Sequence, residues 1–211
     1  MPNLTLGTLI SESTALVGGR LDLSASQVSL YVNMAQLEVA RAIPHGEMEA
    51  TTALKVTASG KTASGFPSDF DVPLSLSRVS AFDGFSHLNL TRISIGEIDD
   101  AADSGGTATG TPNRYALMGE QVWLYPTPTS ADSLLFRYRK VPADMTATTD
   151  MPSIHTRYHP AILYKTAENL AMRAVNPELA AYYRNTYISF MQATPSTQES
   201  RAQSERQNTE R

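Results

Sequence analysis

The spacing of the apolar residues changes twice along this chain, and that change limits the fold more than any other feature. Apolar residues recur at helical spacing in residues 1–49 and 151–193, whereas in residues 50–150 they alternate with polar residues. A period of 3.6 residues indicates amphipathic helices, and a period of 2 indicates strands with one buried face. We therefore expect an α+β fold, in which N- and C-terminal helices form a small bundle and an antiparallel β-sandwich or barrel-like domain is inserted between them.

Local signals predict where individual helices begin and end. A short helix is expected over residues 6–16, and Gly18 and Gly19 would end it. Ser24 and Gln27 have the spacing of a capping box, in which each side chain bonds to the backbone of the other residue. Pro177 suits the first turn of the last helix, where no backbone N–H is needed.

The second helix carries two apolar stripes. One consists of Val28, Tyr31, Val32, Ala35, Val39 and Ala42, and the other of Leu30, Met34 and Leu37. An apolar arc this wide indicates a helix that is covered on more than one side.

The clearest strand pair is a hairpin over residues 115–125, with Gly119 and Glu120 as its two-residue turn. In this register one face holds Tyr115, Leu117, Val122 and Leu124, and the other holds Met118, Trp123 and Tyr125. With the neighbouring alternations, the hairpin predicts five to seven strands, which is enough for a small sandwich or barrel.

The overall composition excludes several classes of protein. A chain of 211 residues makes one domain, or one domain with an insertion. The absence of cysteine excludes disulfide frameworks, thiolate zinc sites and cysteine nucleophiles, and the net charge of −4 argues against a strongly basic nucleic-acid surface. No apolar run approaches the roughly 20 residues that span a bilayer, and the N-terminus lacks the features of a signal peptide. We expect a soluble protein, made in the cytosol and not associated with a membrane.

The four histidines do not indicate a metal or catalytic site. His155 and His159 are four residues apart, but prolines bracket them and no third ligand lies nearby. Zinc sites need three or four ligands. His45 and His87 are isolated and show no triad signature around a serine. We expect His155 and His159 to be surface or capping residues.

An acidic stretch, with Glu97, Asp99, Asp100 and Asp103, precedes two glycines and is expected to be a solvated loop. Calcium binding is an alternative, although the spacing is not that of an EF-hand. A third interpretation, which applies only if the protein forms a ring, is an acidic rim that repels passing DNA phosphate. No pair of carboxylates can be assigned to acid–base work, so we expect no enzyme, catalytic residue, cofactor or metal.

The last helix and the tail after it carry the candidate interface residues. Tyr182, Tyr183, Tyr187 and Phe190 have the spacing of a core stripe, yet two consecutive tyrosines cannot both point inward. At least one is therefore exposed, and tyrosine is a common interface anchor. Residues 194–211 are almost entirely polar, which is typical of a segment that stays disordered until it binds.

Three stretches, residues 28–41, 110–142 and 151–159, resemble the head-to-tail adaptor (connector or neck) proteins of tailed bacteriophages. The first is similar to the family's first long helix, with Asn33 and Gln36. The second is similar to its hairpin, in which a Gly-x-Pro loop precedes a strand ending in Pro-x-Pro, and the third leads into a helix of small residues.

The resemblance implies residues 1–49 and 151–193 as the helical adaptor core, 50–150 as the inserted β-domain and 194–211 as an extension that reaches the portal. It implies a dodecameric ring in the virion neck, between capsid and tail. The ring would join the portal to a tail, nozzle or tube protein. Genome DNA would pass through the ring without sequence-specific binding, with the acidic stretch as a channel-facing candidate. The portal-docking candidates are Tyr182, Tyr183, Tyr187, Phe190, Arg201, Arg206 and Arg211.

Two other functions remain open from the sequence. Trp123, Tyr125 and Tyr138 could form a stacking platform for sugar rings, which would make the chain a receptor- or carbohydrate-binding β-module of a virion or cell surface. An enzyme would require a deep pocket that combines His155 and His159 with the acidic stretch.

Overall fold

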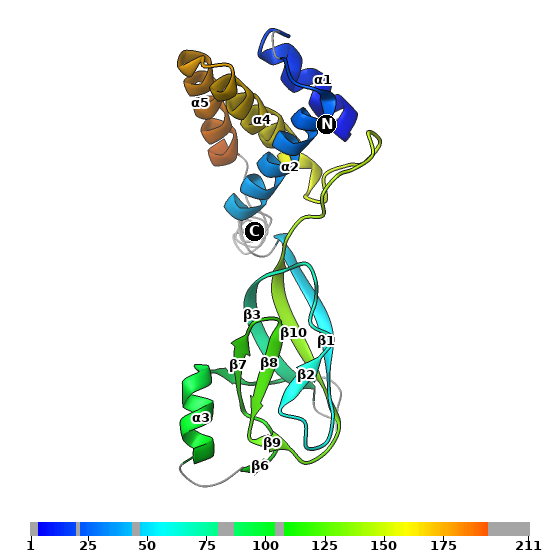
Figure 1. Cartoon of the computed structure of the whole chain (residues 1–211), viewed down its shortest axis with the longest axis vertical. Coiled ribbons are helices and arrows are strands. Elements are labelled where there is room, and N and C mark those ends of the chain that lie inside the picture. The colour runs from blue at the N-terminus through cyan, green and yellow to red at the C-terminus, as the bar shows by residue number, and fades with distance from the viewer. Residues whose placement is uncertain (1–3, 20–21, 44–46, 80–86, 104–107, 194–211) are drawn as a thin grey trace, which may run out of the picture. The chain divides into compact units, whose positions relative to one another are not determined.

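The computed structural model describes residues 4–19, 22–43, 47–79, 87–103 and 108–193 (Figure 1). The chain divides into two compact units, one of residues Met1–Met48 with Val141–Arg211 and the other of residues Glu49–Lys140. The first unit is helical and the second consists mainly of strands, which confirms the expected α+β class.

The helical unit is built around one central helix. Helix α4 packs against each of the other three helices, and short 3₁₀ helix η2 leads into it. The elements are α1 (Leu6–Leu16), α2 (Ala25–Ala42), η2 (Thr156–Tyr158), α4 (His159–Arg173) and α5 (Pro177–Ala193). The core between them includes Leu9, Val32, Val39, Ile162 and Leu170, all fully buried.

The predicted helix boundaries are confirmed, because the local signals act as expected. The backbone N–H of Gln27 donates to Ser24 Oγ, and the N–H of Ser24 donates to Gln27 Oε1 at 2.9 Å, which completes the capping box of α2. Helix α1 ends before Gly18 and Gly19, whose φ angles of +85° and +65° favour glycine. Pro177 is the first residue of α5.

Residues 141–150 belong to the helical unit, although their sequence pattern predicted that they are part of the inserted domain. Met145 is buried in the helical core. The backbone N–H of Leu6 donates to the carbonyl of Asp150 at 2.8 Å, and that of Gly7 donates to the carbonyl of Thr148 at 2.9 Å. These hydrogen bonds are isolated polar contacts along an irregular segment, so the spacing of apolar residues in the sequence does not reveal them.

The β unit is a nearly closed, barrel-like sheet of eight strands. Its strand order is β4-β3-β10-β1-β2-β8-β7-β5, and its two end strands are consecutive in the chain, separated only by Leu90. The strands are β1 (Glu49–Val56), β2 (Thr62–Ser64), β3 (Phe70–Val79), β4 (His87–Asn89), β5 (Thr91–Arg92), β7 (Arg114–Met118), β8 (Gln121–Tyr125) and β10 (Asp132–Lys140). One short segment therefore pairs with both β3 and β7, and this brings the sheet's edges together.

Most strand pairs are antiparallel, but two are parallel, which the expectation of an antiparallel domain did not include. Strand β5 runs parallel to β7, and β6 (Thr109–Gly110) runs parallel to β9 (Thr127–Pro128) in a separate two-stranded sheet. In both parallel pairs only two residues of each strand are paired, and such a stretch is too short for a sequence pattern to show.

The hairpin of β7 and β8 has the predicted register. Tyr115 is opposite Leu124, and Leu117 is opposite Val122. Gly119, in the turn, has a φ of +60°. Tyr115, Val122 and Leu124 are buried in the barrel interior with Leu54, Val56, Ala63, Leu76, Leu90, Leu134, Phe136 and Tyr138. The face that alternation marked as apolar is thus the face that forms the core.

Candidate functional site

Of the aromatic residues predicted at an interface on α5, the structure leaves Tyr182 the most exposed. Its exposed fraction is 62%, against 6% for Tyr183. The Tyr183 hydroxyl donates to the carbonyl of Leu16 at 2.8 Å, and burial raises the pKa of that hydroxyl. Tyr187 and Phe190 are half-buried and pack against the helical core. The expected division of the two consecutive tyrosines is confirmed: one faces inward and one faces outward.

An ionic network beside these tyrosines joins three helices. Lys165 Nζ lies 2.9 Å from Glu38 Oε2 and 3.0 Å from Glu168 Oε2, and Arg184 Nε lies 3.0 Å from Glu168 Oε1. Burial lowers the pKa of Lys165, but its hydrogen bonds to Glu38 and Glu168 outweigh burial and raise that pKa above its usual value. A lysine held charged in this way is a poor base or nucleophile, so the network is a structural tie between α2, α4 and α5.

A second polar cluster holds the segment that returns from the β unit. Asn33 on α2 bonds twice to the backbone of Met145: its Nδ2 donates to the carbonyl and its Oδ1 accepts from the N–H, both at 3.0 Å. Gln36 Nε2 donates to the carbonyl of Ala143 at 2.9 Å, and its Oε1 accepts from the N–H of Ser153. Asn33 and Gln36 are the two polar residues of the helix that carry the family resemblance, and they clamp this segment onto α2.

The acidic stretch is a helix and not a loop, which corrects the sequence prediction. Helix α3 (Ile95–Asp103) begins at a capping box in which the Ser94 N–H donates to Glu97 Oε2 at 2.7 Å and the Glu97 N–H donates to Ser94 Oγ at 3.2 Å. The bonds from the Ser94 N–H and hydroxyl hold the pKa of Glu97 below its usual value. The spacing of Ser94 and Glu97 was the signal that could have identified this helix.

Helix α3 turns one face to the barrel, and the carboxylates of Glu97, Asp99 and Asp100 to solvent. Ile98 is buried, and α3 contacts β7, whereas Glu97, Asp99 and Asp100 are exposed. Asp103 is the last residue of the helix. Within the described residues, no group of three or more acidic or histidine side chains could hold a metal ion. The side chains of Glu97, Asp99 and Asp100 therefore give the helix an exposed acidic face.

The aromatic side chains considered for sugar binding do not form one platform. Tyr138 lies in the barrel interior, stacked on Phe136 with ring centroids 5.6 Å apart, and its hydroxyl donates to Asp69 at 2.7 Å. Burial, together with that hydrogen bond, raises the pKa of Tyr138 to about 12. Trp123 and Tyr125 are half-buried on strand β8, on the alternation opposite to the interior residues. The proposed platform is therefore wrong, because its members lie on opposite faces of the sheet.

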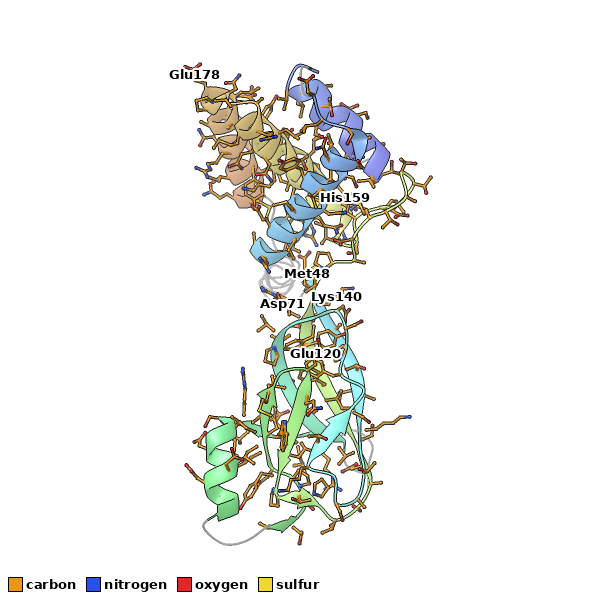
Figure 2. All side chains as sticks on the ribbon, viewed as in Figure 1. Met48, Asp71, Glu120, Lys140, His159 and Glu178 are labelled. Carbon is orange, nitrogen blue, oxygen red and sulfur yellow. The ribbon has the colours of Figure 1, made fainter. Side chains whose placement is uncertain are left out.

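The histidines have structural positions. His155 Nδ1 accepts from the N–H of Arg157 at 3.2 Å and caps η2, as expected of a capping residue. His159 is buried at the start of α4 instead of on the surface, with Nε2 3.2 Å from the carbonyl of Ile154 (Figure 2). His45 and the side chain of His87 lie outside the described residues.

Two hollows on the described surface offer no catalytic arrangement. The larger, of about 140 Å³, lies between α4 and α5 and is lined by Glu168, Met172, Pro177, Ala180, Ala181 and Arg184. The smaller, of about 40 Å³, lies beside α3 and Trp123. Neither is lined by a histidine, and the two charged groups of the larger are bonded to each other. The acidic helix belongs to one unit and His155 and His159 to the other, so no pocket within one unit combines them.

Comparison with known proteins identifies the family to which the chain belongs. No described helix is long and apolar enough to cross a membrane. A comparison with curated proteins found no relative that matches the chain. A family model described as SU10 adaptor protein matches residues 4–210, which is nearly the whole chain. The chain therefore belongs to the SU10 adaptor protein family, which makes it a phage adaptor protein.

Proposed function

We propose that this protein is a structural adaptor of the virion neck. Its copies form a dodecameric ring that joins the portal to the protein below it. The single observation that carries the proposal is the family match over residues 4–210. A helical unit with a barrel inserted between its helices suits this role, because it supplies two compact bodies that can contact different neighbours.

We place the contact with the portal at the C-terminal end of the chain. Residues 194–211, which carry Arg201, Arg206 and Arg211, follow directly on α5 and lie outside the described residues. Tyr182 on α5 adds an exposed aromatic group, the kind of side chain that anchors interfaces. In this arrangement the tail and Tyr182 contact the portal together.

The proposed role in DNA passage is passive. The exposed carboxylates of Glu97, Asp99 and Asp100 would repel DNA phosphates if α3 faces the lumen of the ring. Repulsion of this kind keeps the genome from sticking to the wall and needs no base-specific contact. No step of bond chemistry is assigned to the protein, because the buried Glu168 and its partner Lys165 are held in the ionic network that ties α2, α4 and α5 together.

Co-sedimentation with portal rings from the same particle, followed by imaging of the complex, tests this function. The full chain is expected to sediment with the portal and to appear as a second ring stacked coaxially on it. Failure of the full chain to bind the portal would overturn the adaptor proposal.

Two tail variants form a matched pair for the docking site. The variant R201A/R206A/R211A is expected to lose portal binding, while E199A/E205A/E210A, which changes the same number of charges in the same segment, is expected to keep it. Truncation after Ala193 keeps every described element and should behave like the arginine variant. Normal portal binding by the truncated chain would show that the tail does not dock.

A further inference from the structure

Helix α2 has an exposed apolar face opposite its buried one. Val32 and Val39 are fully buried, while Leu30 and Met34, on the other side, have exposed fractions of 61% and 47%. We call Leu30, Met34, Leu37 and Arg41 the α2 face, because they follow one another at helical spacing. The sequence predicted that this stripe is covered, yet within the described residues Leu30 and Met34 remain open to solvent.

Helix α5 has a matching exposed face on the side away from the same core. Ala180 and Tyr183 are buried, whereas Ile188 is 42% exposed and Glu178, Ala181 and Asn185 are also exposed. We call Glu178, Ala181, Asn185 and Ile188 the α5 face. Figure 2 shows Glu178 at the outer end of α5.

The two faces are complementary when the helices run antiparallel. Leu30 and Arg41 are 11 residues apart on α2, which spans about 16 Å, and Ile188 and Glu178 are 10 residues apart on α5, which spans about 15 Å. If Leu30 lies against Ile188, Arg41 therefore lies against Glu178. Between them, Leu37 of one helix lies opposite the small Ala181 of the other, and Met34 lies opposite Asn185.

The charges at the ends of the faces support this pairing. Neither Arg41 nor Glu178 forms an ion pair with another described residue of the chain. Arg41 lies at the C-terminal end of α2 and Glu178 in the first turn of α5, the ends at which helix dipoles favour each charge. An antiparallel contact brings these two ends together, and a parallel contact would separate them.

We propose that the α2 face of one copy of this protein packs antiparallel against the α5 face of the next copy. The proposal deepens the proposed function and rests on it in one respect, since it names the contact between subunits of the ring. Both helices pack on α4, and each face lies on the side of its helix away from that core. A contact between two different faces is heterologous, and its repetition produces a ring or an open chain instead of an isolated dimer.

Disulfide cross-linking tests the pairing directly, because the chain has no cysteine of its own. The variant L30C/I188C, oxidised both free at high concentration and bound to portal rings, is expected to yield a ladder of covalent multimers. A mixture of the single variants L30C and I188C is expected to stop at dimers, since each chain then carries one reactive face. The control L30C/E12C places the second cysteine on the exposed side of α1 and is expected to give no ladder.

Several outcomes would overturn the pairing. These are the absence of a ladder in both conditions, equal cross-linking by the L30C/E12C control, or dimers from L30C alone, which would indicate a symmetric contact. A charge exchange gives independent evidence: R41E and E178R should each weaken self-association, and the double variant R41E/E178R should restore it.

Portal co-sedimentation of the unmodified chain separates this proposal from the proposed function. Portal binding without a ladder would discard the α2–α5 contact and keep the adaptor role. A ladder without portal binding would discard the adaptor role and keep the contact.

Discussion

The substitution Asn33→Ala tests whether the clamp on the returning segment stabilises the helical unit. It removes two hydrogen bonds to the backbone of Met145, each 3.0 Å long. Each such bond contributes about 1 kcal/mol net. Met145 is only 3% exposed, so its N–H and carbonyl would lose partners in a place that water reaches poorly. We expect a loss of about 2–3 kcal/mol in the free energy of unfolding.

Urea unfolding followed by circular dichroism at 222 nm measures this loss, because the signal reports mainly on helices. The matched control is Ser189→Ala, an exposed polar residue on α5 outside the α5 face. Both substitutions gain helix propensity of about 0.5 kcal/mol, so the difference between the variants isolates the clamp. If the two variants unfold within 0.5 kcal/mol of each other, the argument that these bonds hold the segment in place is refuted.

Three further predictions concern other parts of the chain. Burial lowers the pKa of His159, so the stability that its neutral form contributes is complete above about pH 6.5 and is lost as the pH falls toward the folded-state pKa; H159Q should flatten this slope in pH-dependent urea unfolding, and an unchanged slope would contradict it. Glu168→Gln should cost about 2 kcal/mol because Glu168 is buried and bonded to two cations, whereas Arg184→Ala, at an exposed side chain, should cost less than about 1 kcal/mol in the same assay; equal losses would show that burial is not the deciding factor. Gly119→Val should destabilise the β unit by about 1–2 kcal/mol because φ is +60°, as followed by the fluorescence of Trp123, while Gly119→Asn should be tolerated better; equal effects would rule out backbone strain at this turn.

Elements with strong local signals could be predicted from the sequence. The capping box at Ser24 and Gln27, the glycines after α1 and the alternation on both sides of Gly119 each involve residues within a few positions of one another. Their structural consequence is therefore local, and the structure confirms all three. Helix α3 also has a local signal, the capping box at Ser94 and Glu97, although the sequence prediction made this stretch a loop.

The polar contacts of the candidate surfaces could not be predicted in this way. Asn33 and Met145 are 112 positions apart, and Lys165 meets Glu38 on another helix. An amide or a charged side chain in a helix pattern is most simply assigned to the solvent face. Only the packed structure shows that Gln36 and Glu168 are buried and bonded.

The sequence by itself determined the class of the fold, the order of its parts and the inner face of its hairpin, because hydrophobic period and capping chemistry act over short distances. The tertiary structure alone decided that the strand segment around Leu90 closes the barrel and that Tyr183, and not Tyr182, faces the core. It also decided that the second apolar stripe of α2, with Leu30 and Met34, stays uncovered by the described part of its own chain. Which side of a helix or strand finds a partner depends on elements far away in the sequence, and a local pattern carries no information about them.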